Sequence, residues 1–161
     1  MPADLHIELL PVGHPDAQLL VEAVQQEYVV RYGGRDVTPM RASELEPPWG
    51  AFYVGYHDGR AVMTGAWRFR DDVSRLGSST PAEVKRMYVA PEARRRGLAR
   101  VMLTHLEATA GAAGADVMIL ETGAAQPEAM ALYEACGYVR VEPFGHYRDS
   151  DQNRCYGRTL P

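Results

Sequence analysis

The 161-residue chain has few of the features that define secreted, membrane or metal-binding proteins. Its two cysteines, Cys136 and Cys155, are too few for a disulfide framework and lack metal-ligand spacing, so both should be reduced thiols. No apolar run reaches the roughly 18 residues that a membrane span needs. Residues 1–4 show neither the basic nor the apolar part of a signal peptide. The sequence therefore predicts a cytoplasmic protein with no metal site.

Lysine is also scarce in this chain, and acidic residues outnumber basic ones. The net charge is −4, and Lys85 is the only lysine among the 17 lysines and arginines. An acidic balance argues against general nucleic-acid binding, which relies on basic surface. The remaining composition, 46% hydrophobic and 24% charged, is that of an ordinary globular protein. We expect one domain, residues 1–161, that is large enough to bury a core.

Hydrophobic periodicity predicts alternating strands and helices along the chain. Helices are expected over residues 16–32, 97–113 and 127–136, and strands over residues 6–10, 51–56, 61–69, 83–89, 117–121, 138–141 and 153–158. The apolar stripe of the first helix should contain Leu19, Leu20, Ala23, Val24, Tyr28 and Val29. The pair Asp58-Gly59 predicts a hairpin between the second and third strands. This order of elements predicts an α/β or α+β fold with helices on both faces of one sheet.

An arginine-rich turn precedes the second predicted helix. Its residues are Arg94, Arg95, Arg96, Gly97, Leu98, Ala99 and Arg100. Four arginines at a helix start lie beside free N–H groups that already carry partial positive charge, which is unfavourable unless an anion binds there. Gly97 leaves room for backbone N–H groups to approach a phosphate. The turn matches neither a P-loop nor a Rossmann fingerprint, but it predicts a site for a diphosphate.

Three motifs in this order resemble the GNAT superfamily of N-acetyltransferases. The turn, Arg94-x-x-Gly97-x-Ala99, is similar to the Q/R-x-x-G-x-G/A signature of that family. Residues 83–91 before it resemble the family's fourth strand, and residues 126–138 after it resemble its N-x-x-A-x-x-L-Y-E-x-x-G-F/Y block. The resemblance implies a mixed, mostly antiparallel sheet of about seven strands, splayed between its fourth and fifth strands.

The resemblance also implies acetyl-coenzyme A as cofactor, with direct transfer of its acetyl group to a primary amine. The family binds the diphosphate in the arginine-rich turn. The pantetheine arm would lie beside Met87, Tyr88 and Val89, where a bulge leaves a backbone N–H free to polarise the thioester carbonyl. Gln126 occupies a position that contacts the cofactor or a catalytic water in the family, although asparagine is usual there.

Two residues are candidates for proton transfer. The resemblance places Tyr133 where the family protonates the departing thiolate, and Glu83 where several members have a general base. Helical spacing alone would make Tyr133 a core residue, since aromatic residues in such a pattern are usually buried. Glu83 could equally be a solvated residue at the end of a strand. The sequence leaves both alternatives open.

The acceptor pocket should be built from the first helix, the segment after it and the loop before the last strand. The aromatic candidates for contact with substrate are Tyr28, Tyr32, Trp49, Trp67, His146 and Tyr147. Residues 120–123 and 143–147 resemble a bacterial subgroup of small GNAT proteins that includes the YsnE-like acetyltransferases. We expect a small amine or amino-acid derivative as acceptor, because no extended acidic channel for a basic tail is evident. The sequence leaves homodimerisation open.

Two other functions compete with catalysis. The chain could be a non-catalytic, regulatory module that binds acyl-coenzyme A, with the fold retained and turnover lost. It could also bind nucleic acid through the arginines of the turn, although four arginines on an acidic protein are a weak footprint. The presence of Tyr133 beside the predicted phosphate turn favours the enzyme.

Overall fold

The computed structural model describes residues 4–161 and contains one seven-stranded sheet. The strands are β1 (Leu5–Leu9), β2 (Gly50–His57), β3 (Arg60–Phe69), β4 (Ala82–Val89), β5 (Val117–Gly123), β6 (Val139–Arg140) and β7 (Asn153–Thr159). The helices are α1 (Pro15–Tyr32), α2 (Leu98–Ala112) and α3 (Pro127–Ala135), with 3-10 turns at Ala42–Leu45 and Pro91–Ala93. The predicted order of elements is confirmed, and their ends lie within about two residues of the predicted ones.

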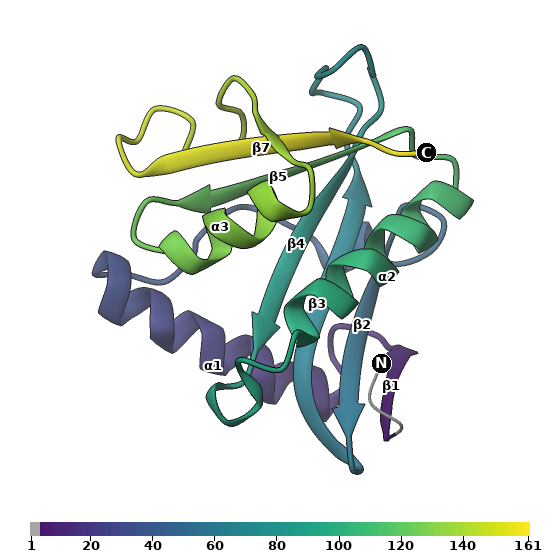
Figure 1. Ribbon diagram of the computed structural model, residues 1–161, viewed down its shortest axis with the longest axis vertical. Helices are drawn as coiled ribbons and strands as arrows, with labels where there is room; N and C mark the ends of the chain where they lie inside the picture. Colours follow the sequence, from purple (N-terminus) through teal and green to yellow (C-terminus); the bar gives the residue numbers. More distant parts are fainter. Residues whose placement is uncertain (1–3) are drawn as a thin grey trace.

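The sheet has the strand order β1-β2-β3-β4-β5-β7-β6. All neighbouring strands are antiparallel except β4 and β5. These two parallel strands pair only at Ala82 with Met118 and at Glu83 with Ile119. Beyond those pairs they diverge, so the sheet opens into a V whose arms are β4 and β5 (Figure 1). The expected splay between the fourth and fifth strands is therefore confirmed.

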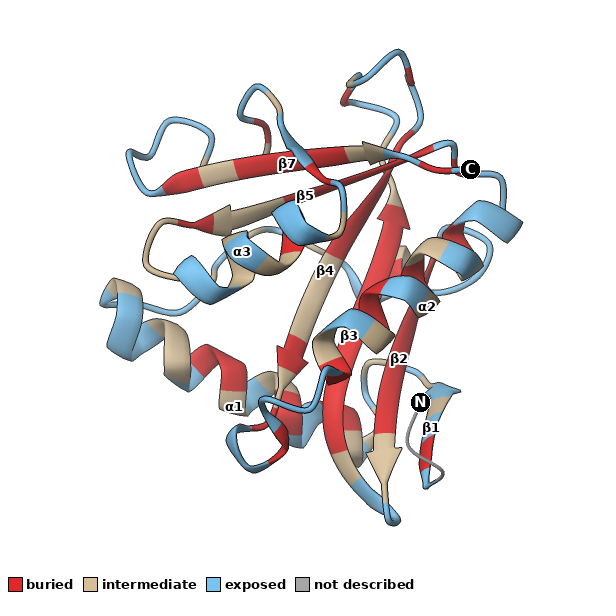
Figure 2. Cartoon of the chain, in the orientation of Figure 1, coloured by how far each residue is buried: buried red, intermediate tan, exposed pale blue. Residues whose placement is uncertain are grey.

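Helices cover both faces of the sheet (Figures 1 and 2). On one face, α1 packs Leu20 and Val24 against the buried residues of β2 and β3. On the other face, α2 packs Met102 and Leu106 into the larger core cluster, which α3 joins through Tyr133. A Cβ atom on Gly65 of β3 would come within 2.6 Å of the Met102 side chain, so glycine allows this close approach. None of the helices in residues 4–161 has the length and apolar character that a membrane crossing requires.

The predicted apolar stripe of α1 is wrong at two positions. Leu19 is 69% exposed and Val29 is 40% exposed, whereas Ala17 and Gln25 are buried. The pattern was wider than the face that a helix can bury against a sheet. Gln25 is buried because its side-chain amide exchanges two hydrogen bonds with the backbone of Asp36, at 2.7 and 3.2 Å.

A bulge interrupts the pairing of β4 with β3. Thr64 pairs with Tyr88 and Ala66 pairs with Lys85, so two β4 residues lie opposite one β3 residue. Arg86, the first residue of the bulge, has φ = 57°, a conformation that is rare for a residue with a side chain. The buried Thr64 hydroxyl donates to the Arg86 carbonyl at 2.6 Å and fixes this backbone. The bulge lies where the sequence resemblance places it.

We expect Thr64→Val to lower the free energy of unfolding by about 1–2 kcal/mol, because the partly buried Arg86 carbonyl then lacks its donor. Valine keeps the shape of threonine, so little packing is lost. Thr104→Val, on the exposed face of α2, is the matched control and should leave stability almost unchanged. Chemical denaturation of the three proteins measures the effect. Equal stability of the two variants would show that the hydroxyl does not hold the bulge.

His105 of α2 should make stability depend on pH. Its Nε2 is buried and has no partner within residues 4–161, and its ring packs edge-on against Tyr53 at 4.4 Å between centroids. Burial lowers the pKa of His105, so near pH 6 the folded protein binds fewer protons there than the unfolded chain. Above pH 6.5, about the pKa of histidine in the unfolded chain, His105 does not reduce the free energy of unfolding. As the pH falls below that value, the free energy of unfolding decreases.

The melting temperature of the wild type should therefore drop more between pH 7.5 and 5 than that of His105→Phe. His6→Gln removes a histidine whose side chain is 54% exposed, so that variant should follow the wild type. Parallel curves for the wild type and His105→Phe would show that this histidine is not the acid-sensitive group.

Candidate functional site

The arginine-rich turn between β4 and α2 presents a row of free backbone donors. Arg95 and Gly97 have φ values of 65° and 75°, which turn successive N–H groups toward the same side. The N–H groups of residues 95–100 find no acceptor in the described chain, and the first internal bond of the helix joins Val101 to Gly97. Apart from Gly97 itself and its neighbours in the chain, no atom lies within 4 Å of where a Gly97 Cβ would stand, so the space above the turn is open. This geometry suits an anion.

The arginines of the turn have different roles in the structure. Arg94 is already engaged: it donates to Glu27 of α1 at 2.6 Å and to the Val89 carbonyl at 2.9 Å. Its guanidinium also lies over the Tyr88 ring, at 5.7 Å. Arg95, Arg96 and Arg100 are exposed and have no acidic partner in residues 4–161. Arg94 therefore fixes the turn to α1, and the other three supply uncommitted positive charge.

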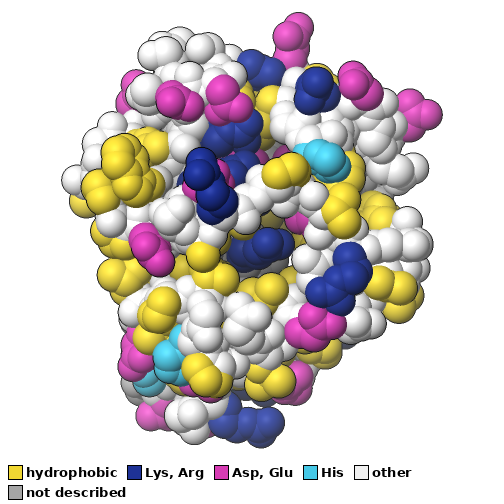
Figure 3. All heavy atoms as spheres, turned by 180° about the vertical axis from the view of Figure 1, so that it is seen from behind, with side chains coloured by type: hydrophobic (Ala, Val, Ile, Leu, Met, Phe, Trp, Pro, Cys, Tyr) yellow, Lys and Arg dark blue, Asp and Glu magenta, His cyan; other side chains and the backbone are white. Residues whose placement is uncertain are grey.

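A cavity of about 360 Å³ lies between the diverging strands β4 and β5. Its walls come from both strands, the end of α1, α3 and the loop before β7. They include Tyr28, Tyr32, Lys85, Arg86, Met87, Glu121, Gln126, Tyr133, Tyr147 and Asn153. Figure 3 shows a hollow on the face opposite to that of Figure 1, with basic and acidic side chains around it. The structure thus brings together Met87, Gln126, Tyr133 and three of the aromatic candidates.

Tyr133 has a hydroxyl with no partner in the described chain. The side chain is 7% exposed, and its ring packs near Tyr138 and Tyr156, at 5.9 and 6.2 Å between centroids. Burial raises the pKa of Tyr133 well above its usual value, so the hydroxyl keeps its proton at neutral pH. A neutral phenol that borders a cavity can donate that proton.

Gln126 and Tyr32 are joined by a hydrogen bond between their side chains. The Tyr32 hydroxyl donates to Gln126 Oε1 at 3.0 Å, and the Thr122 hydroxyl lies 3.5 Å from the same oxygen. Nearby, Arg31 donates to the Ala125 carbonyl at 3.2 Å. The end of α1 therefore fixes the loop from β5 to α3, and the Tyr32 hydroxyl is committed to that contact.

Tyr147 links the loop before β7 to the segment after α1. Its hydroxyl donates to Asp36 Oδ1 at 3.0 Å and accepts from the Val37 N–H at 2.9 Å. Burial alone would raise the pKa of Asp36, but hydrogen bonds from Thr38 and Tyr147 and nearby positive charge lower it below its usual value. Asp36 is thus a carboxylate that fixes one wall of the cavity.

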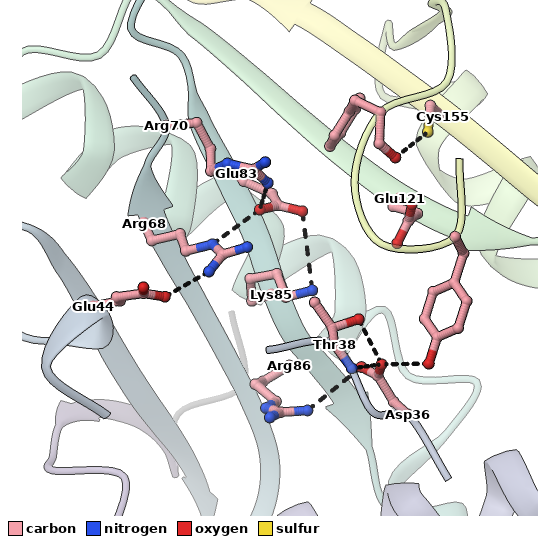
Figure 4. A network of polar contacts seen from close by, with 12 residues as sticks. Asp36, Thr38, Glu44, Arg68, Arg70, Glu83, Lys85, Arg86, Glu121 and Cys155 are labelled. Carbon is pink, nitrogen blue, oxygen red and sulfur yellow. Dashed lines mark hydrogen bonds and ion pairs between the residues drawn. The ribbon is translucent and has the colours of Figure 1, made fainter. Parts of the chain in front are cut away.

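Glu83, predicted as general base, lies in a buried ion-pair network at the fork of the two strands (Figure 4). Its side chain is 2% exposed. Oε1 accepts from Arg68 Nε at 3.0 Å and from Arg70 Nη1 at 2.7 Å, and Oε2 lies 3.9 Å from Lys85 Nζ. Arg68 also donates to Glu44 at 2.6 Å. One oxygen of Glu83 is therefore fully occupied by guanidinium donors.

Glu121 of β5 is a second carboxylate, which the sequence analysis did not single out. It borders both the small cavity and an adjoining one of about 1090 Å³. Oε2 accepts from Asn153 Nδ2 at 2.7 Å, and Oε1 has no partner in the part of the chain described. Burial raises the pKa of Glu121, an effect that the Lys85 ammonium partly offsets. Its place in residues 120–123, which resemble the bacterial subgroup, was the available signal.

The aromatic candidates not yet described individually lie in three different places. Trp49 and His146 line the larger cavity, whereas Tyr28 lines the small one. Trp67 is 3% exposed, donates from Nε1 to the Thr109 hydroxyl at 3.0 Å and lines neither cavity. The structure therefore places Trp67 in the core beneath α2, outside the lining of both cavities.

Comparison with known sequences identifies the family to which this chain belongs. Residues 18–138 match the family described as the Acetyltransferase (GNAT) family. An IAA acetyltransferase of Azospirillum brasilense is 45% identical over 65 residues. That stretch is 40% of this chain and 42% of the A. brasilense protein, so the match covers about two fifths of each.

Solved structures support the same fold over the whole length. A Klebsiella pneumoniae protein proposed to be an acyl-CoA N-acyltransferase is 26% identical, with a TM-score of 0.77 over 99% of this chain and 100% of that one. A GNAT acetyltransferase of Elizabethkingia anophelis with acetyl-CoA bound is 12% identical, with a TM-score of 0.67 over 99% and 100%. The IAA acetyltransferase of Bacillus cereus is 17% identical, with a TM-score of 0.64 over 97% and 99%. The chain belongs to the GNAT family of acetyltransferases.

Proposed function

We propose that this acetyltransferase takes its acetyl group from acetyl-coenzyme A and transfers it directly to a primary amine of a small molecule or amino-acid derivative. The observation that carries the proposal is the opening between β4 and β5, with free N–H donors at the turn and a neutral tyrosine on the cavity wall. The partial match to the A. brasilense IAA acetyltransferase supports a small-molecule acceptor and the YsnE-like subgroup.

The residues of the opening fit the coenzyme along its length. The turn of residues 95–100 offers its N–H groups and three free arginines to the diphosphate. The edge of β4 beyond Glu83 has no strand beside it, so Met87, Tyr88 and Val89 can pair with the amide groups of the pantetheine arm. The bulge at Arg86 re-aims the backbone in the same region. When bound, the coenzyme supplies an activated acetyl thioester.

Proton transfer requires two groups, one that donates a proton and one that accepts it. Tyr133 donates its proton to the sulfur as the carbon–sulfur bond breaks and the nitrogen–carbon bond forms. A carboxylate, Glu121 or Glu83, takes the proton that the amine loses. The geometry favours Glu121, because its Oε1 is free and it borders both cavities, whereas Glu83 is held by two guanidinium groups.

Measuring acetyl-coenzyme A consumption with a panel of amines tests the function. If the protein binds acetyl-coenzyme A normally but consumes it with none of the amines, the non-catalytic alternative is favoured.

Gly97→Glu should weaken acetyl-coenzyme A binding about a hundredfold or more, because a carboxylate would stand against the diphosphate. Gly97→Ala is the matched control, since both variants share the backbone strain of φ = 75° but alanine adds no charge. Calorimetry at two salt concentrations measures both affinities. Equal binding by the two variants would place the diphosphate elsewhere.

Tyr133→Phe should lower kcat on the order of a hundredfold and leave the KM for acetyl-coenzyme A near normal, because only the proton donor is lost. Tyr138→Phe is the control: Tyr138 is a buried neighbour whose hydroxyl donates to Glu107 at 2.7 Å. Steady-state kinetics compares the two. A similar kcat in both variants would mean that another group protonates the thiolate.

The pH–rate profile distinguishes the two carboxylates. Because burial raises the pKa of Glu121, the rate should climb with pH through that raised value as the base loses its proton. Glu121→Gln should flatten this lower limb and lower kcat, whereas Glu83→Gln should keep the limb. If Glu83→Gln is the variant that flattens it, the base is Glu83, as the sequence resemblance implies.

A further inference from the structure

Lys85, the only lysine of the chain, is a largely but not fully buried cation that makes no hydrogen bond within residues 4–161. It lies on β4 directly before the bulge, and its side chain is 10% exposed. The nearest carboxylate oxygen, Glu83 Oε2, is 3.9 Å from Nζ, which exceeds hydrogen-bond distance. An ammonium has three donors, and none of the three has an acceptor within the described residues. Lys85 lines the small cavity, so acceptor atoms that enter there can reach these donors.

Glu83 and Asp36, two acidic residues near Lys85, make their hydrogen bonds with other residues (Figure 4). Glu83 Oε1 is shared by Arg68 and Arg70. Asp36 accepts hydrogen bonds from Thr38 and Tyr147 and pairs with Arg86 at 3.7 Å. The network at the strand fork is also balanced in charge, with three cations and three anions: Arg68, Arg70, Lys85, Glu44, Asp72 and Glu83. Of these carboxylates, only Glu83 Oε2 faces Nζ, and it lies beyond hydrogen-bond distance.

Glu121 is the other uncommitted charged group of the small cavity. Its Oε1 has no partner among residues 4–161, and it lies on β5, the strand opposite Lys85. The two groups interact, because the Lys85 charge opposes the effect of burial on the pKa of Glu121. One cation and one anion thus line the same cavity, and each has hydrogen-bonding positions that the described chain leaves unused.

We propose that the small cavity binds a zwitterionic amino acid, with its carboxylate on the Lys85 ammonium and its amine at Glu121. This assignment rests on the proposed function and narrows its acceptor. A simple amine would leave the donors of Lys85 unsatisfied, and a diamine would bring a second positive charge toward them. The larger cavity of about 1090 Å³ also borders Glu121, so it lies next to the proposed position of the amine.

Lys85 also provides a direct probe, since lysine labelled with ¹³C at Cε gives the NMR signal of a single residue. The protein saturated with coenzyme A is titrated with the twenty common L-amino acids, β-alanine and γ-aminobutyrate, and with their primary amides. At least one amino acid should shift the Lys85 signal saturably, and its amide, which lacks the carboxylate, should not. No shift with any amino acid, or an equal shift with the matching amide, would overturn the proposal.

Kinetics with the amino acid that shifts the signal provides the second measurement. The ratio of kcat/KM for the acid to kcat/KM for its amide should fall about 30-fold in Lys85→Met, because a charged hydrogen bond is lost for the acid only. Lys85→Arg keeps the charge and should restore part of the ratio. An unchanged ratio in Lys85→Met contradicts the assignment.

The proposed function and the role of Lys85 are tested by different results. If the wild type does not bind acetyl-coenzyme A in calorimetry, the proposed function is wrong. If it binds and consumes acetyl-coenzyme A with acids and amides alike, only the role of Lys85 is wrong.

Discussion

The early end of pairing between β4 and β5 is the constraint on which the rest of the site depends. Two paired residues on each strand hold the fork together, and beyond Glu83 the strands separate. A strand edge that loses its neighbour inside a protein exposes backbone donors and acceptors that need partners. The small cavity, the free edge of β4 and the donors of the arginine-rich turn all follow from this divergence. The opening is therefore a property of the sheet and not of a surface loop.

Two sets of interactions keep the opening in place. At the fork, Glu83 receives guanidinium groups from Arg68 and Arg70 where the strands still pair, and breaking such a buried network by removing one member is costly. Along β4, the Thr64 hydroxyl holds Arg86 in a backbone conformation that few residues adopt. Both sets place charged and strained groups next to the cavity, as is common where a fold carries chemistry. The stability of the sheet and the shape of the site thus share the same residues.

The helices, the strands and the arginine-rich turn could be predicted from the sequence, because each depends on residues that are close together in the chain. Glycine at a positive φ, proline at a helix start and helical periodicity identify the turn and the helix of Tyr133. The position of Trp67 in the core could not be predicted in the same way. Residues of β3 are buried on both faces, so the alternation that distinguishes the two faces of a half-exposed strand is missing. The roles of Glu83 and Glu121 depend on partners far away in sequence, such as Arg68 and Asn153.

Amide hydrogen exchange with and without acetyl-coenzyme A tests the central claim, that the coenzyme occupies the opening between β4 and β5. Exchange should slow at residues 95–100, where free N–H groups gain acceptors, and at residues 87–89, where the edge of β4 gains a partner. Exchange in β1 and β2, at the end of the sheet away from β5, should change only as much as binding stabilises the whole folded protein. Protection that spares the turn and the β4 edge, or that is uniform over all strands, would contradict the account.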